Sequence, residues 1–504
     1  MEFTPIGFVC LLAGLLIVAR PMTLGLPVFA AFLPLQTAAA VNLWSIGGLS
    51  LVCAHILVGA LVAAIALRPR VAAAAVREAT ARPAVILLFA FVCYALFSAF
   101  FMPRLFEGGV HVYSLARPTD GTLRVSLSPL HPTSGNITQS FYVALNLLLF
   151  GVIVFIIGRR GDMRQATFII NTATAVHLFF ALISMAPTAG PVAAILDFVR
   201  TANYSILTHH TVAGMKRIIG SYAEASAFGA TSMGLFAWNF LRFLQTRGLW
   251  HLAASLLLLG CIVVSFSTTA YAVMSLLIII WSLHTVYTLV RRGLSADHLT
   301  ALFSSALASA LLIAFLFYEP LRLRAYELVE ILFGRKLQSA SGIERSAWNM
   351  QALSNFVETF GLGVGLGSAR TSSLATALLS NVGAVGALLY LGFLGQSFLR
   401  PWRRSIKTPE TGEAVYARRI FVAARGGALA MLLSHIIAGG LIDGGLAFFV
   451  FAGLAAAAIP QAKRQRLSRE IMTLGSPATA LWYPRRQPQG EIAHGFSPFA
   501  AHSS

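Results

Sequence analysis

The chain has 504 residues, of which 57% are hydrophobic and only 11% are charged, and its mean hydropathy is +0.76. A soluble protein carries roughly 25% charged residues, so this composition excludes a soluble globular protein and indicates a polytopic membrane protein.

The cysteines all lie inside apolar runs, at Cys10, Cys53, Cys93 and Cys261. Such positions suit packing, so we expect no disulfide and neither a metal site nor a cofactor.

Runs of apolar residues predict an all-α transmembrane protein with about 12–14 spans, since each run approaches the ~20 residues that cross a bilayer. The runs fall at about 5–19, 22–40, 43–67, 84–102, 141–158, 166–186, 220–241, 249–265, 268–290, 299–318, 373–399, 426–442 and 445–460. The chain therefore divides into transmembrane helices over 1–318 with outer loops at 103–140 and 187–219, a large outer loop with short helices at 319–372, and transmembrane helices over 373–460. A basic tail rich in Pro and Gly follows at 461–504, and we expect it to be disordered.

Charge is divided unequally between the two sets of loops. The set that includes the 400–425 loop and the tail carries 25 of the 37 basic and 7 of the 18 acidic residues, whereas the other set carries 12 basic and 11 acidic residues. Basic loops remain in the cytoplasm, so the tail is expected there and the N-terminus outside. The net charge of +19 then reflects topology and attraction to membrane lipid, and we expect no nucleic-acid partner.

The outer loop at 103–140 contains two short alternating pieces, Val110–Tyr113 and Leu123–Leu127, with Asp120 and Gly121 between them. Alternation on both sides of an Asp-Gly pair predicts a small β-hairpin.

The outer loop at 187–219 leads into a span that begins with an arginine and a carboxylate. Arg217 and Glu224 are seven residues apart, which would place them two turns apart on one helix face. A carboxylate at this depth is costly unless it is paired or faces water. We expect both side chains to line a cavity that is open to the outside, and the alternative is a structural ion pair. A hydroxyl-rich hairpin follows at 265–271, where satisfaction of backbone groups is the simpler interpretation.

The stretch from 341 to 399 combines an amphipathic helix, a glycine-rich turn and a long apolar run. Glycine recurs at 361, 363, 365 and 367, and Arg370 and the N-cap residue types Thr371, Ser372 and Ser373 follow. Amide-rich turns, an arginine and a helix start together outline an anion site. Close helix packing around a tight turn is the alternative interpretation.

Four motifs in this order resemble the bacterial O-antigen ligase and O-antigen or exopolysaccharide polymerase superfamily of the inner membrane. They are Arg217–Gly220–Glu224, the 265–271 sequence S-F-S-T-T-A-Y, Arg345-x-x-Trp348 followed by the alternating glycines, and Gly383-x-x-Gly386 followed by Leu-Leu-Tyr. One departure concerns Ser372, which occupies the position where the ligases carry histidine, and this departure favours a polymerase. The resemblance makes the outer loops periplasmic.

The resemblance implies a glycosyltransferase that moves a growing glycan from undecaprenyl pyrophosphate to a hydroxyl of another lipid-linked repeat unit, without a metal ion. The implied partners are undecaprenyl-pyrophosphate-linked oligosaccharide, membrane lipid and a chain-length regulator. We expect catalytic roles for Arg217, Glu224, Arg345 and Arg370, and pyrophosphate binding by Gly363, Gly365, Gly367, Ser372 and Ser373. His209 and His210 are weaker candidates for the base. Transfer of the glycan to another acceptor, as in the ligases, and transport of the lipid-linked oligosaccharide remain the alternative functions.

Overall fold

The computed structural model describes residues 2–43, 49–116, 124–160, 163–185, 191–204, 206–208, 211–212, 215–292, 340–399, 412–440, 442 and 444–459. The expected span at 299–318, the first part of the large outer loop, His209, His210 and the tail at 461–504 lie outside these residues.

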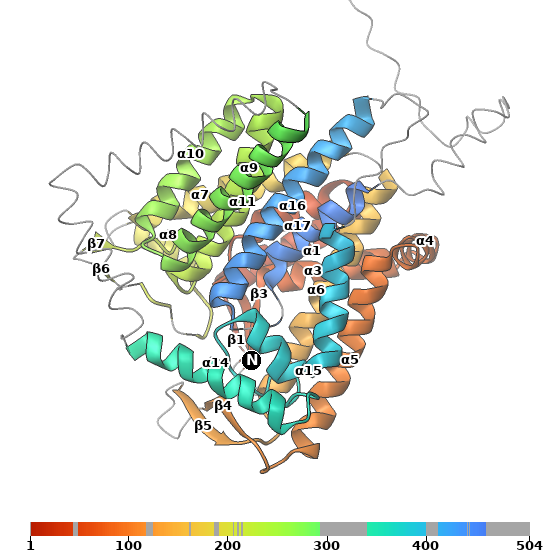
Figure 1. The fold of residues 1–504 in the computed structure, drawn as a ribbon. Helices are drawn as coiled ribbons and strands as arrows, with labels where there is room; N and C mark the ends of the chain where they lie inside the picture. The colour runs from red at the N-terminus through yellow and green to blue at the C-terminus, as the bar shows by residue number, and fades with distance from the viewer. Residues whose placement is uncertain are drawn as a thin grey trace, which may run out of the picture. The chain divides into compact units, whose positions relative to one another are not determined.

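The described residues form a helical membrane protein, as the composition predicts (Figure 1). Six helices are long and apolar enough to cross a bilayer: α5 (Pro83–Leu105), α6 (Ser134–Arg160), α7 (Met163–Met185), α11 (Thr268–Arg292), α15 (Leu374–Leu394, continued by the π-helix η3, Gly395–Leu399) and α16 (Gly412–Ala438). Shorter apolar helices are α1 (Pro5–Ala19), α10 (Leu249–Val264), α17 (Gly445–Ala458) and the pair η1 (Pro21–Gly25) and α2 (Leu26–Phe32). α9 (Ala225–Thr246) and the short α8 (Pro191–Val199) complete the part before α10.

Two of the expected spans are wrong in part. Residues expected at the end of the 22–40 span and the start of the 43–67 span form strands β2 (Ala39–Leu43) and β3 (Leu49–Val52), which pair antiparallel with each other. β1 (Glu2–Phe3) adds a third strand, so the sheet satisfies the backbone groups of this segment. α3 (Cys53–Ala66) follows, and an angle of 110° separates it from the amphipathic α4 (Pro69–Thr80).

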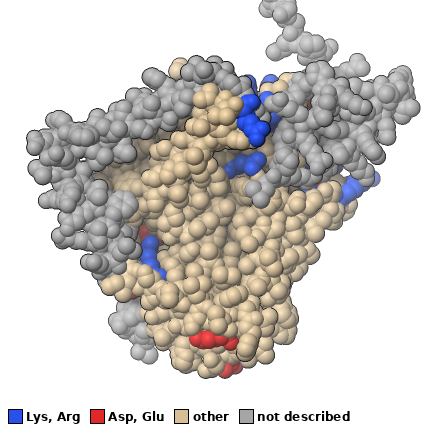
Figure 2. Space-filling model, in the orientation of Figure 1, with Lys and Arg blue, Asp and Glu red and all other residues tan. Residues whose placement is uncertain are grey.

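One end of the helical bundle carries the polar elements of the outer loops. β4 (His111–Ala116) and β5 (Arg124–Pro129) form the expected antiparallel hairpin, and they lie beside the amphipathic α14 (Ala340–Glu358) in Figure 1. Strands β6 (Thr211–Val212) and β7 (Met215–Lys216) form a second hairpin. On the face shown in Figure 2, Lys and Arg gather towards the upper end, where α16 begins, and Asp and Glu towards the end that carries α14.

The glycine-rich turn after α14 inserts its backbone into a break in α15. The break lies at Gly383, whose φ of 63° and ψ of −166° interrupt the helix. The carbonyl groups of Ser380 and Asn381, which the break frees, accept hydrogen bonds from the amides of Val364 (2.7 Å) and Gly365 (3.0 Å). The amide of Ala384 donates to the carbonyl of Gly361 at 2.8 Å. The backbone groups that the break in α15 leaves without helical partners thus bond to the glycine-rich turn.

Candidate functional site

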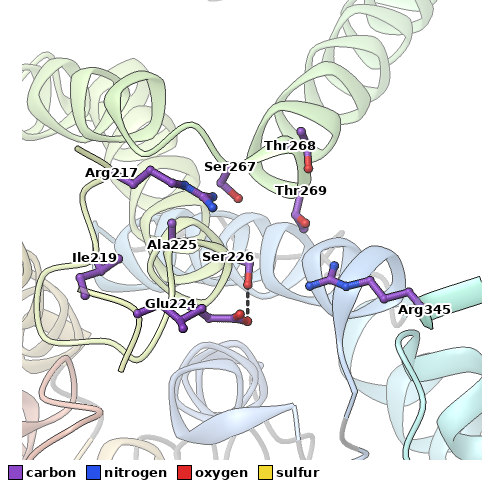
Figure 3. Close-up of a pocket in the computed structure, with 10 residues that line it drawn as sticks. Arg217, Ile219, Glu224, Ala225, Ser226, Ser267, Thr268, Thr269 and Arg345 are labelled. Carbon is purple, nitrogen blue, oxygen red and sulfur yellow. Dashed lines mark hydrogen bonds between the residues drawn. The ribbon is translucent and has the colours of Figure 1, made fainter. Parts of the chain in front are cut away.

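A cavity of about 210 Å³ opens where three separate parts of the chain meet. Its lining comes from the segment before α9, the turn between α10 and α11, and α14, and comprises Leu207, Arg217, Ile219, Glu224, Ala225, Ser226, Ser267, Thr268, Thr269 and Arg345. In Figure 3 the guanidinium groups of Arg217 and Arg345 enter from opposite sides, and the Glu224 carboxylate lies between and below them. The structure therefore brings together three of the four residues with predicted catalytic roles.

Arg217 is fixed by the turn between α10 and α11. Its Nε donates to the carbonyl of Ser265 at 3.1 Å, and its Nη2 donates to the carbonyl of Phe266 at 3.0 Å. Phe266 adopts a left-handed φ of 47° in this tight turn. Burial lowers the pKa of Arg217, and the nearby Glu224 carboxylate opposes this effect. The guanidinium nevertheless stays charged, because arginine does not lose its proton in proteins.

Glu224 does not share a helix face with Arg217, contrary to the prediction. It is the N-cap residue of α9, with extended φ and ψ of −149° and 160°, and Arg217 precedes the helix in irregular chain. Its carboxylate does not bond to the first amides of α9 and instead accepts a hydrogen bond from the Ser226 hydroxyl. Within the part of the chain that the structure describes, the one ion pair closer than 4.0 Å joins Arg82 to Glu78. Arg217 and Glu224 thus line a cavity, as expected, and do not form the alternative ion pair.

Two helix N-termini face this cavity. Ala225 and Ser226 belong to the first turn of α9, and Thr268 and Thr269 begin α11, whose Ser267 hydroxyl accepts from the amide of Ala270 at 3.3 Å. The first amides of an α-helix lack intrahelical partners and carry partial positive charge. The helix starts that line this cavity are therefore those of α9 and α11, whereas the sequence suggested an anion site at the start of α15. From the sequence we expected the hydroxyls of 267–269 only to satisfy backbone groups. Their succession in the chain was the signal that could have marked them as cavity residues.

Buried contacts hold the segment that carries Arg217 and Glu224. Gly220 adopts a φ of 54° and its carbonyl accepts from Nη2 of Arg200 at 2.7 Å. The ring nitrogens of His177, on α7, lie 3.2 Å from the Tyr222 hydroxyl and 2.8 Å from the Ser232 hydroxyl. His177 is 1% exposed, and its two contacts link α7 to the segment before α9 and to α9 itself. His177 was not identified from the sequence, because a lone histidine in an apolar run belongs to no motif with a defined spacing.

α14 positions the other half of the site. Asn349 accepts hydrogen bonds from the amide of Ser372 (2.9 Å) and the hydroxyl of Thr376 (2.8 Å), and so ties α14 to the start of α15. Arg345 lies one turn earlier and on the same helix face, which directs it to the cavity (Figure 3). The described residues give Arg345 neither a hydrogen bond nor an ion pair within 4.0 Å.

Arg370 does not line the cavity but lies within electrostatic range of it. Its guanidinium carbon is 5.0 Å from the centre of the Trp348 ring, and its amide donates to the carbonyl of Tyr113 at 2.7 Å. Burial lowers its pKa, the charge of Glu224 opposes this effect, and the charge of Arg345 reinforces it. Arg370 nevertheless keeps contact with solvent, so this burial is only partial. Three arginines therefore surround one carboxylate, which leaves an excess of positive charge for an anionic ligand.

The glycine-rich turn does not offer its amides to a ligand, so the predicted pyrophosphate contacts of Gly363, Gly365 and Gly367 are corrected. These three amides donate to the Thr359 hydroxyl (2.9 Å), the Asn381 carbonyl (3.0 Å) and the Asn381 side chain (3.1 Å). All three glycines have φ between 83° and 99°. An added Cβ at Gly363 would lie 2.7 Å from the amide of Gly383, and one at Gly365 would lie 2.6 Å from Pro103. Close packing, the alternative interpretation, explains these glycines.

Ser372 and Ser373 also have structural partners. Ser372 is 7% exposed, its amide is bonded to Asn349, and it does not line the cavity. Ser373 is the N-cap residue of α15, as predicted, where its hydroxyl accepts from the amide of Ala375 at 3.3 Å. The same hydroxyl donates to the carbonyl of Ile436 at 2.7 Å. The predicted role of these serines in pyrophosphate binding is therefore not supported by their contacts.

No group of three or more His, Cys, Asp or Glu side chains that could hold a metal ion occurs among the residues with described positions. Comparison with known proteins finds no protein-family model that matches the chain and no curated protein that matches it.

Proposed function

We propose that the protein is a polysaccharide polymerase of the bacterial inner membrane, with its active site open to the periplasm. It would transfer a growing glycan from undecaprenyl pyrophosphate to a hydroxyl of another lipid-linked repeat unit. The observation that supports this proposal is the cavity in which Arg217 and Arg345 face Glu224, with Arg370 in electrostatic range.

The proposed reaction needs positive charge and one base. The acceptor hydroxyl oxygen forms a bond to the anomeric carbon of the donor glycan, while the bond between that carbon and the pyrophosphate oxygen breaks. The electron pair leaves with undecaprenyl pyrophosphate, and the acceptor proton passes to the Glu224 carboxylate. Arginine suits the departing group because its fork matches phosphate oxygens and its charge is permanent. In this proposal the arginines, with the N-termini of α9 and α11, supply the charge that a metal ion supplies in other transferases.

The size of the cavity fits recognition of a headgroup. At about 210 Å³ it is smaller than the roughly 300–1,000 Å³ of typical small-molecule pockets. A pyrophosphate would enter it while the lipid and the glycan remain outside. Ser372, at the position of the ligase histidine in the resemblance, is buried away from the cavity, and this favours polymerisation over transfer to another acceptor.

The test is polymer length in cells that produce Arg345→Ala or Arg370→Ala protein at the wild-type level. We expect loss of long polymer and accumulation of single lipid-linked repeats in the periplasmic leaflet. Arg104→Ala is the matched control, since Arg104 is exposed at the same end of the bundle and bonds only to the carbonyl of Phe100 in the described structure.

Purified protein in proteoliposomes separates polymerisation from transport. A polymerase elongates lipid-linked repeats without an ion gradient, whereas a flippase moves them between leaflets unchanged. Repeats that accumulate on the cytoplasmic side in the variant cells would refute polymerisation and support transport. Normal polymer in both arginine variants would refute the proposed site.

A further inference from the structure

A second basic site lies at the opposite end of α9 from the candidate active site. α9 is about 33 Å long, and Arg242 is located one turn before its end at Thr246. Arg242 is only 2% exposed, and its Nε atom has no hydrogen-bond partner. Its Nη1 donates to Gln245 at 3.2 Å, and its guanidinium carbon is 5.1 Å from the centre of the Tyr416 ring.

No acidic side chain neutralises this arginine within the described part of the chain. α7, α9 and α10 contain no Asp or Glu, and Glu413, the acidic residue of α16, is exposed and forms no ion pair within 4.0 Å. Among the described residues, Arg419 adds a charge of the same sign that repels Arg242. A buried charge without a counterion is costly, and ionisable groups at membrane depth generally face a partner.

The surrounding helices add positive potential. α10 begins at Leu249 on this side, and the described parts of α7 and α16 begin at Met163 and Gly412. α9 packs against α7, α10 and α16, and α7 also packs against α10 and α16. Tyr416 is held by the hydroxyl of Thr167 on α7 at 2.8 Å, so the aromatic wall of the site is fixed. Helix N-termini favour anions, and here they accompany a buried arginine whose Nε is free.

The depth of the site points to lipid as the source of the anion. Arg242 is about 6 Å along the helix axis from the end of α9, and Trp250, in the first turn of α10, is 45% exposed. Exposed tryptophan at a helix end is typical of the boundary between headgroups and acyl chains. Figure 2 shows Lys and Arg gathered at this end of the molecule. Basic pockets between transmembrane helices bind anionic headgroups.

We propose that α7, α9, α10 and α16 form a binding site for the headgroup phosphate of an anionic phospholipid, with Arg242 as the principal ligand and Arg419 at its rim. The phosphate would accept from the free Nε of Arg242 and supply the negative charge that the described residues do not supply. This inference does not depend on the proposed polymerase function.

The test is native mass spectrometry of the purified full-length protein with added phosphatidylglycerol or phosphatidylcholine. We expect a retained phosphatidylglycerol adduct for the wild type, and binding weakened about tenfold or more in Arg242→Gln. Arg291→Gln is the matched control, since Arg291 stacks at 5.7 Å on Tyr287 at the same end of the bundle but is exposed. The control should keep the adduct.

Three outcomes would overturn the proposal. They are equal adducts with both lipids, an unchanged adduct in Arg242→Gln, and full competition by inorganic phosphate, which would identify a site for the free ion. Size-exclusion elution and circular dichroism check the fold of each variant. If Arg242→Gln does not fold, Arg419→Gln replaces it, because Arg419 is exposed, and the phosphatidylglycerol adduct should again weaken relative to Arg291→Gln.

Discussion

Replacement of Gly383 by alanine should separate the glycine-rich turn from α15. Gly383 has φ 63° and ψ −166°, a region that only glycine adopts readily. An added Cβ would also overlap the carbonyl oxygens of Gly361 and Leu362. The turn therefore has to withdraw, and the three backbone hydrogen bonds that join it to the break in α15 lengthen or open.

The expected loss of unfolding free energy is about 3–6 kcal/mol. Backbone strain at such a position costs about 1–3 kcal/mol. Each intramolecular hydrogen bond that opens costs about 1 kcal/mol. Two or three of the bonds between the turn and α15 would open. The full figure applies if the turn withdraws without finding new partners.

The assay is unfolding of the detergent-solubilised protein by increasing SDS fraction, followed by tryptophan fluorescence. Gly392→Ala on the same helix is the control, since its added Cβ would lie 3.5 Å from Leu87, an ordinary contact distance. Because alanine favours helix over glycine, the control should stay within about 1 kcal/mol of the wild type. Equal stability of Gly383→Ala and Gly392→Ala would refute the interlocked arrangement of turn and helix.

Three further predictions concern the site and its support. Asn381→Leu should lower the free energy of unfolding by about 2–4 kcal/mol, because the amides of Gly367 and Ala369 lose their side-chain acceptor; a loss below 1 kcal/mol in the same SDS assay would contradict this. Glu224→Gln should reduce elongation of lipid-linked repeats about 10²–10⁴-fold if Glu224 is the base, whereas Ser226→Ala should have a much smaller effect; near-normal elongation by Glu224→Gln would exclude this role. Trp348→Leu should reduce elongation about 2–30-fold, since it removes the ring beneath Arg370. Its effect should largely disappear in an Arg370→Ala background, and additive losses would show that Trp348 acts elsewhere.

The sequence by itself determined the class of the protein and much of its local structure. Long apolar runs can be stable only in a bilayer, and there the backbone must be satisfied within each segment, so most spans were predicted close to their observed bounds. Local patterns also predicted the hairpin of 111–129, the amphipathic helix 340–358 and the N-cap at Ser373. These features depend on neighbours in the chain, which a sequence displays directly.

Only the tertiary structure decided which residues form the cavity. The pairing of Arg217 and Glu224 with Arg345 joins segments more than a hundred residues apart, and the motif order alone does not fix their distances. The strands at 39–43 and 49–52 escaped prediction because apolar composition does not distinguish a buried strand from a buried helix. The glycines of 363–367 were ambiguous for a related reason. A glycine with free amides and one that packs against another backbone look the same in sequence, and only the partner atoms of α15 show which one is present.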